Sequence, residues 1–267
     1  MSNFFRIRSA SGLGDAVYAY PVCKYYKEKG ENVILETQFP EIFEPLGIAT
    51  TTERLLDYEL NCSYVPFKGD RNTNQFQDTL RAAKIDAEIP FKIELKKRHP
   101  DFRFVEPIWA AMGKAIPEVK VGTKKICIVA DLYMASGIRH RETLIPNQLV
   151  YEAIIELLKA KGYLTVLTGQ GQTVIQNTDV NIKNETDITN LLAFVNSADL
   201  VLTQVGALLP IAEALGKKCI SILSANYRKS GDAFLNQITP RKVVSAPTSV
   251  CFQDDEGGML AKIGEFV

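Results

Sequence analysis

A glycine turn lies between an apolar segment and a helical pattern at the start of the chain. Residues 4–8 predict a strand, and residues 16–29 predict a helix. Gly12 and Gly14 let the intervening backbone turn sharply and approach a ligand closely. In open α/β folds ligands bind at the carboxyl ends of the strands, which is where this turn delivers Asp15. Asp15 either caps the helix or presents its carboxylate to a ligand, and the local sequence leaves both interpretations open.

Composition excludes several classes of protein. The 267 residues are 46% hydrophobic and 23% charged, as in globular proteins, and 31 basic residues balance 31 acidic ones. A zero net charge argues against a strongly basic nucleic-acid binder. No apolar run approaches the roughly 20 residues of a membrane span, and no signal peptide is visible. Five widely spaced cysteines without a CxxC pair and only two histidines predict a reduced, cytoplasmic protein without a metal site. We expect no cofactor.

The second half of the chain alternates strands with helices. Apolar runs of strand length alternate with segments of helical periodicity, separated by short connections. This pattern predicts a parallel sheet covered on both faces. The expected strands span residues 125–130, 163–168, 199–203 and 219–223; the expected helices span 147–161, 186–197 and 208–215, with a last helix in 257–267.

The first half repeats the same pattern less regularly. After the first helix we expect a strand and a short helix, followed by a weakly patterned middle region and a linker. The strand–loop–helix order restarts near residue 124, so we predict two Rossmann-like domains, residues 1–121 and 122–267, that face each other across a cleft. The further elements expected in the first half are strands at 32–36, 64–67 and 93–95, helices at 40–46, 75–83 and 105–115, and a linker at 117–124.

Three loops of the second half are predicted to line this cleft. Gln204, Gly206 and Ala207 follow a strand and precede a helix, whose free N–H groups can hold a phosphate. Arg139 and Arg141 follow the first strand of this half; their guanidinium groups either bind a diphosphate, which we favour, or only solubilise the loop. Gly169 and Gln170 end the next strand, where their amides either contact a ribose or base or only shape a turn. Together with Gly12 and Gly14, these residues are the candidate donor-binding residues.

These motifs resemble the heptosyltransferase-like glycosyltransferases of family 9. The similarity rests on Gly12-Leu-Gly14-Asp15, on residues 187–203, on Gly206 and on residues 212–216. The resemblance implies a GT-B fold and an inverting transferase that uses a nucleotide-diphosphate sugar. It also implies Asp15 as the general base, Arg139 or Arg141 at the phosphates, and Gly206 with Ala207 in the glycine turn. The transferred sugar would be a hexose, pentose or heptose, and the acceptor a glycan.

Three alternatives remain open from the sequence. A phage-type enzyme that glycosylates a hydroxymethylated DNA base would need a phosphate-contacting patch, which the basic residues between 92 and 103 offer. A nicotinamide-dependent dehydrogenase is disfavoured because Val17 occupies the third glycine position of its fingerprint. A catalytically inactive nucleotide-sugar-binding protein is suggested by the turn at Gln204, where the family often has Asp-Ser/Thr-Gly.

Overall fold

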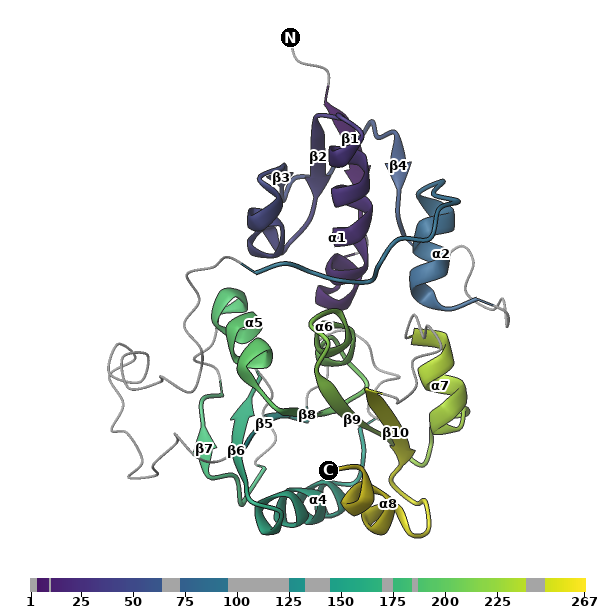
Figure 1. Ribbon diagram of the computed structural model, residues 1–267. Coiled ribbons are helices and arrows are strands. Elements are labelled where there is room, and N and C mark those ends of the chain that lie inside the picture. Colours follow the sequence, from purple (N-terminus) through teal and green to yellow (C-terminus); the bar gives the residue numbers. More distant parts are fainter. Residues whose placement is uncertain are drawn as a thin grey trace.

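The protein forms two parallel sheets in a computed structural model, one in each half of the chain (Figure 1). The structure describes residues 4–9, 11–63, 73–95, 125–132, 145–169, 175–183, 187–238 and 248–267. Within these residues, no helix is both long and apolar enough to cross a membrane.

Over the described part of the first half, the N-terminal sheet has four strands in the order β3-β2-β1-β4. Its central strand places Ile7 opposite Leu35, and both side chains are buried beneath α1. Arg8 and Glu36 alternate to the other face, where their side chains form an ion pair at 3.0 Å. The elements of this half are β1 (Phe5–Arg8), α1 (Leu13–Glu28), β2 (Val33–Glu36), the 3₁₀ helix η1 (Pro40–Leu46), β3 (Ala49–Thr51), β4 (Leu60–Asn61) and α2 (Gln75–Ala82).

Within the described ranges, the C-terminal sheet has six parallel strands in the order β10-β9-β8-β5-β6-β7, which is the strand order of the Rossmann fold. Helices α4 and α8 cover one face, while α5, α6 and α7 pack on the other. The prediction of a sheet covered on both faces is therefore confirmed. The elements are β5 (Lys125–Ala130), α4 (Gln148–Ala160), β6 (Tyr163–Thr168), β7 (Val180–Asn181), α5 (Ile188–Ser197), β8 (Leu200–Gln204), α6 (Leu208–Ala214), β9 (Lys218–Leu223), α7 (Gly231–Ile238), β10 (Ser249–Gln253) and α8 (Met259–Phe266).

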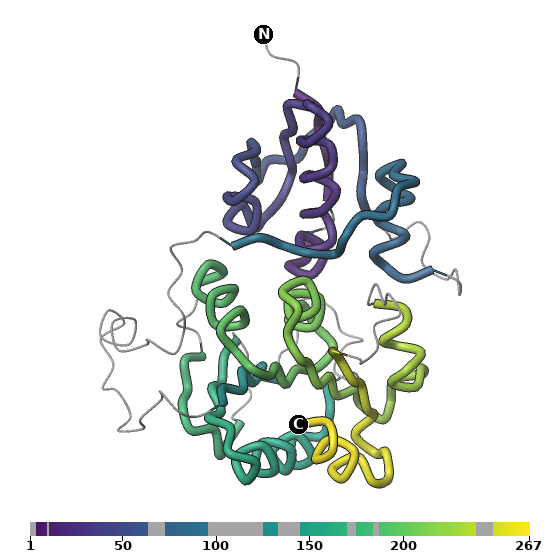
Figure 2. The backbone as a smooth tube through the Cα atoms, in the orientation of Figure 1, coloured from purple at the N-terminus to yellow at the C-terminus, as the bar shows by residue number. Residues whose placement is uncertain are grey.

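The two halves share one apolar core. Side chains of α1 belong to the same buried cluster as side chains of α6 and α7. Residues 85–95 cross between the halves without helix or strand (Figure 2), and the Ile93 N–H donates to the Ala214 carbonyl at 3.3 Å. The Tyr18 hydroxyl on α1 donates to the Ile238 carbonyl at the end of α7. The halves are thus held together by packing as well as by the chain connection.

The structure corrects several expected boundaries. Helix α1 begins at Leu13 rather than at residue 16, so Asp15 lies inside its first turn. Residues 93–95 were expected to be a strand, but they pack between the halves and join no sheet. Strands β3, β4, β7 and β10 and helix α7 were not expected. The predictions at 64–67, 105–115 and 117–124, and the domain boundary at 121/122, lie outside the described residues.

Candidate active site

Each sheet has a topological switch point, where the strand order reverses. The strands that come first after the central strand lie on one side of it, and the next strand of the chain lies on its other side. In the N-terminal sheet this point lies between β1 and β4, and in the C-terminal sheet between β5 and β8. Ligands of open α/β sheets bind beyond the strand ends at such points. The turn that contains Gly12 and Asp15 follows β1, and the turn that contains Gly206 follows β8. The two predicted motifs therefore occupy the two switch points.

The Asp15 carboxylate closes the first turn of α1. Its Oδ2 accepts a hydrogen bond from the Gly12 N–H at 3.0 Å, so the side chain does serve as part of the helix cap. A Cβ atom on Gly12 would lie 2.6 Å from this oxygen, and only glycine leaves the carboxylate in place. Asp15 is half-buried, which leaves part of its side chain accessible at the rim of the sheet.

Cys62, which follows β4, lies on the other side of the same switch point. Its Sγ donates to the Arg8 carbonyl at 3.0 Å. Burial raises the pKa of the Cys62 thiol to about 12, and the negative charge of Asp15 acts in the same direction. The thiol is therefore neutral at physiological pH and adds no charge beside Asp15.

Gly14 lies where the start of α1, at one switch point, contacts the start of α6, at the other. A Cβ atom on Gly14 would lie 3.4 Å from Cγ of Pro210 and 3.7 Å from Cα of Ala207. The first turn of α1 thus packs directly on the start of α6. Gly14, predicted to contact the donor, is placed against α6. Its small size permits the close approach of the two helices.

The turn after β8 has open space at Gly206. Among the described residues, nothing lies within 4 Å of a Cβ atom built on Gly206, whereas Gln204 is buried at the end of the strand. Ala207 precedes the seven-residue helix α6 and forms no side-chain cap. Gln204 and Ala207 therefore line this turn, and Gly206 is its exposed residue.

The end of β6 is shaped by Asp131, which is not among the predicted site residues. Gly169 has φ of +131°, and a Cβ atom there would lie 2.9 Å from Cβ of Asp131. Asp131 directly follows β5, and its Oδ2 lies 3.0 Å from Nζ of Lys183. Gly169 thus accommodates Asp131. The signal that could have identified Asp131 is its position immediately after a buried strand that was correctly predicted.

A buried tyrosine joins the two strands of the C-terminal switch point. The Tyr151 hydroxyl on α4 lies 2.9 Å from the Ala130 carbonyl and 3.1 Å from the Leu202 carbonyl. These carbonyls belong to β5 and β8, so one side chain bridges the strands near their carboxyl ends. Burial raises the pKa of this hydroxyl well above its usual value, which keeps it protonated as a donor.

The structure does not describe every residue of the predicted site. Arg139, Arg141 and Gln170 lie outside the described residues. Within the described ranges, no three His, Cys, Asp or Glu side chains are grouped so that they could hold a metal ion.

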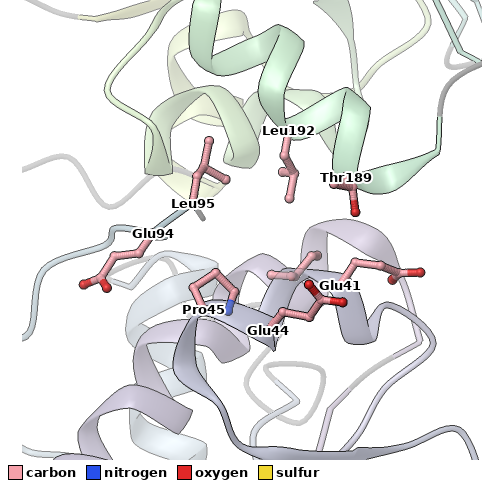
Figure 3. A pocket seen from close by; sticks show the side chains of 8 residues that line it. Glu41, Glu44, Pro45, Glu94, Leu95, Thr189 and Leu192 are labelled. Atoms are coloured by element: carbon pink, nitrogen blue, oxygen red, sulfur yellow. The ribbon is translucent and has the colours of Figure 1, made fainter. Parts of the chain in front are cut away.

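A small pocket between η1 and α5 is lined by Glu41, Glu44, Glu94 and Leu192 among others, and it includes none of the predicted site residues (Figure 3).

Comparison with known proteins identifies the architecture. The sequence matches no protein-family model and no curated protein. The structure, however, is similar to that of ADP-heptose LPS heptosyltransferase II from E. coli, with a TM-score of 0.62 at 11% identity over 94% of this chain and 90% of that chain. The chain has the GT-B fold. The expected resemblance to heptosyltransferase-like glycosyltransferases is thereby confirmed at the level of the fold.

Two further GT-B structures agree with this assignment. A family 9 glycosyl transferase from Veillonella parvula has a TM-score of 0.60 at 10% identity, over 95% of this chain and 87% of that one. The iron-containing dodecameric glycosyltransferase TibC from enterotoxigenic E. coli has a TM-score of 0.60 at 14% identity, over 92% of this chain and 63% of that one. TibC has also been solved in complex with ADP-D-β-D-heptose.

Proposed function

We propose that this protein is an inverting glycosyltransferase that moves a sugar from a nucleoside-diphosphate sugar to an acceptor hydroxyl. The observation that carries the proposal is the contact between the turn after β1 and the turn after β8, mediated by Gly14 and Ala207. A donor held at one switch point would lie beside an acid held at the other. The similarity in fold to heptosyltransferases and other glycosyltransferases supports this interpretation.

Each half of the chain has its own role in the proposed transfer. The donor binds the C-terminal half, residues 122–267, and the acceptor enters from the N-terminal half, residues 1–121. Asp15 accepts the proton of the attacking hydroxyl, while the diphosphate leaves from the opposite face of the sugar. Gly206 with Ala207, and the loop with Arg139 and Arg141, stabilise the departing diphosphate. A cytoplasmic location, predicted from the spacing of the cysteines, belongs to the same proposal.

A thermal-shift screen with nucleoside diphosphates and nucleotide sugars tests donor binding. A ligand at 100 times its Kd stabilises the folded state by about 2.7 kcal/mol, which raises the melting temperature measurably. A donor found in this way is then incubated with acceptor glycans, and the anomeric configuration of the product is read by NMR. Binding without transfer to any acceptor would favour a nucleotide-sugar-binding protein, and absence of binding would contradict the proposal.

A further inference from the structure

A short loop after β9 lies beside the turn at Gly206. Strands β8 and β9 pair in parallel, with Gln204 opposite Ile222 in the register. Continuing that register by two residues brings Gly206 level with Ser224, where the loop of residues 224–230 begins. We call residues 224–230 the β9 loop. It stands at the carboxyl edge of the C-terminal sheet, next to the turn that we propose to bind the donor.

Gln253, the last residue of β10, fixes the backbone on both sides of Arg228. Its side-chain amide donates to the Tyr227 carbonyl at 2.8 Å and to the Lys229 carbonyl at 3.1 Å. An amide NH₂ group has two hydrogens, so it can satisfy both carbonyls at once. A loop that is tied in this way loses less conformational entropy when one of its side chains binds a ligand.

The two ends of the β9 loop are fixed as well. At its start, the Ala225 N–H donates to the Asp254 carboxylate at 2.6 Å, and the Asn147 N–H donates to the other oxygen of that carboxylate, also at 2.6 Å. After its end, a Cβ atom on Gly231 would overlap the Cys251 carbonyl, so α7 begins in close contact with β10. The β9 loop is therefore anchored along its whole length.

The side chains on either side of Arg228 are both directed to α7. The Tyr227 ring packs edge-on against Phe234, with ring centroids 5.2 Å apart. The Lys229 ammonium contacts the Gln237 side chain. Arg228 itself is exposed, and over the residues that the structure describes its guanidinium group has no carboxylate partner. Its neighbours thus anchor the β9 loop, while Arg228 is available to an anion.

We propose that Arg228 is a phosphate-binding residue of the donor site and that Gln253 positions it. A guanidinium group offers planar N–H donors that match the oxygen atoms of a phosphate group. Together with the turn at Gly206, Arg228 holds the diphosphate of a nucleotide sugar from a second side. This inference rests on the proposed function and deepens it, because it adds a donor contact outside the motifs that carry the family resemblance.

The test measures the Kd of ADP, GDP and UDP by calorimetry for the wild type and for variants of Arg228. Arg228→Met removes the charge and is expected to weaken binding about tenfold, the loss of one charge-assisted contact. Arg228→Lys keeps the charge without the planar donors and is expected to weaken binding about threefold. Because Arg228 is exposed, both variants should fold, and thermal unfolding checks this.

Lys229→Met is the matched control, because it removes the same charge from the next residue of the β9 loop. Lys229 contacts Gln237 on α7, so this variant is expected to keep the Kd of the wild type. Measurement at an ionic strength of about 0.15 M screens the long-range effect of an exposed charge. Equal weakening by Lys229→Met and Arg228→Met would show that net charge sets the affinity, and it would overturn the contact by Arg228.

Gln253→Met tests the positioning role. It removes the bonds to the carbonyls of Tyr227 and Lys229, so Arg228 is held less firmly, and the Kd is expected to rise about threefold. In the Arg228→Met background the same substitution should change the Kd no further, because Gln253 acts through Arg228. An equal loss in both backgrounds, or a failure of this half-buried variant to fold, would overturn the positioning role.

The outcomes separate this inference from the proposed function. Diphosphate binding by the wild type that Arg228→Met leaves unchanged would overturn the role of Arg228 alone. Failure of the folded wild type to bind any of the three diphosphates would overturn the proposed function and this inference with it.

Discussion

At the scale of the residue, the Asp15 carboxylate caps a helix at the position where we propose that it acts as a general base. The bond from the Gly12 N–H to its Oδ2 holds the side chain at the start of α1, as a helix cap requires. The same bond orients the carboxylate at the switch point of the N-terminal sheet. Capping therefore does not argue against a catalytic role, because a general base must itself be held in position.

Replacing Asp15 with asparagine separates the two roles. The amide oxygen of Asp15→Asn still accepts from the Gly12 N–H, so the thermal stability and the affinity for nucleotide should change little. The amide is not a base, and turnover should fall by about 10²–10⁴-fold. Steady-state transfer assays and thermal unfolding measure both quantities. Unchanged turnover would remove Asp15 from the chemistry.

Gly12→Ala displaces the carboxylate without removing it. The new Cβ atom would lie 2.6 Å from Asp15 Oδ2, so the carboxylate must move from the position that it holds beside glycine. We expect turnover to fall by about 10²-fold, since small misplacements of a catalytic group have large effects. The stability should fall by only about 0.5–2 kcal/mol, the usual loss for a helix cap.

Gly257→Ala is the control for this variant. Among the residues that the structure describes, nothing lies within 4 Å of a Cβ atom built on Gly257, which is in the turn before α8. Its turnover and stability should match the wild type. Equal turnover of Gly12→Ala and Gly257→Ala would show that the position of the Asp15 carboxylate does not matter.

At the scale of the element, the contact between α1 and α6 brings the turn after β1 next to the turn after β8. The helices approach closely because Gly14 presents no side chain toward Pro210 and Ala207. Each helix follows the strand beside a switch point, so their contact places the carboxyl edges of the two sheets next to each other. The sheets alone would not bring these edges together.

A size series at Gly14 tests this contact. In Gly14→Ala the new Cβ atom has ordinary contact distances, 3.4 Å from Pro210 at the nearest, and alanine favours the helix. We expect its stability within about 1 kcal/mol of the wild type. Gly14→Leu has no room between the helices and should lose about 1–3 kcal/mol by overpacking. Chemical denaturation measures both, and equal stability of the two variants would contradict the close packing.

At the scale of the whole molecule, the apolar core continues from one half into the other. Val17 of α1, Leu209 of α6 and Phe234 of α7 belong to one buried cluster. Separating the halves would expose this surface to water, at about 25 cal/mol per Å² of apolar area. The two halves therefore depend on each other for stability.

This shared core predicts cooperative unfolding. We expect calorimetry to show one thermal transition, whose calorimetric and van't Hoff enthalpies agree. Fluorescence and circular dichroism should give the same midpoint. Two resolved transitions would show that the halves fold independently despite their common core.

Stability should decrease in alkaline solution. Burial raises the pKa of Tyr20 to about 12, with a further contribution from Glu94, and burial raises that of Cys62 to about 12. The unfolded chain loses these protons near pH 9–10, whereas the folded protein keeps them. The contribution of these two groups to the free energy of unfolding is therefore fully present below about pH 9. It is lost as the pH rises toward 12, at up to about 1.4 kcal/mol per pH unit for each group.

Tyr20→Phe removes one of these groups while keeping its ring. Its stability should be close to that of the wild type at pH 7, because Tyr20 is neutral there. Between pH 10 and 12 the variant should lose stability less steeply. Parallel curves of unfolding free energy against pH would show that Tyr20 does not titrate on unfolding.

The sequence by itself determined the local elements and the motif that opens the chain. Strands β5 and β6 match their predicted bounds because continuous apolar runs of this length are typical of buried parallel strands. Strands β4 and β7 have two residues each, too few for any periodicity to be read. Residues 93–95 have the apolar character of a strand, but packing between the halves satisfies it instead.

Only the tertiary structure decided how distant residues combine. The strand order places the turns after β1 and β8 at switch points, and the packing of Gly14 on α6 brings those turns into contact. The pairing of Asp131 with Lys183 joins residues 52 positions apart, across a glycine that sequence reasoning had assigned to the donor. Such contacts depend on which strands neighbour one another, and local periodicity carries no information about that order.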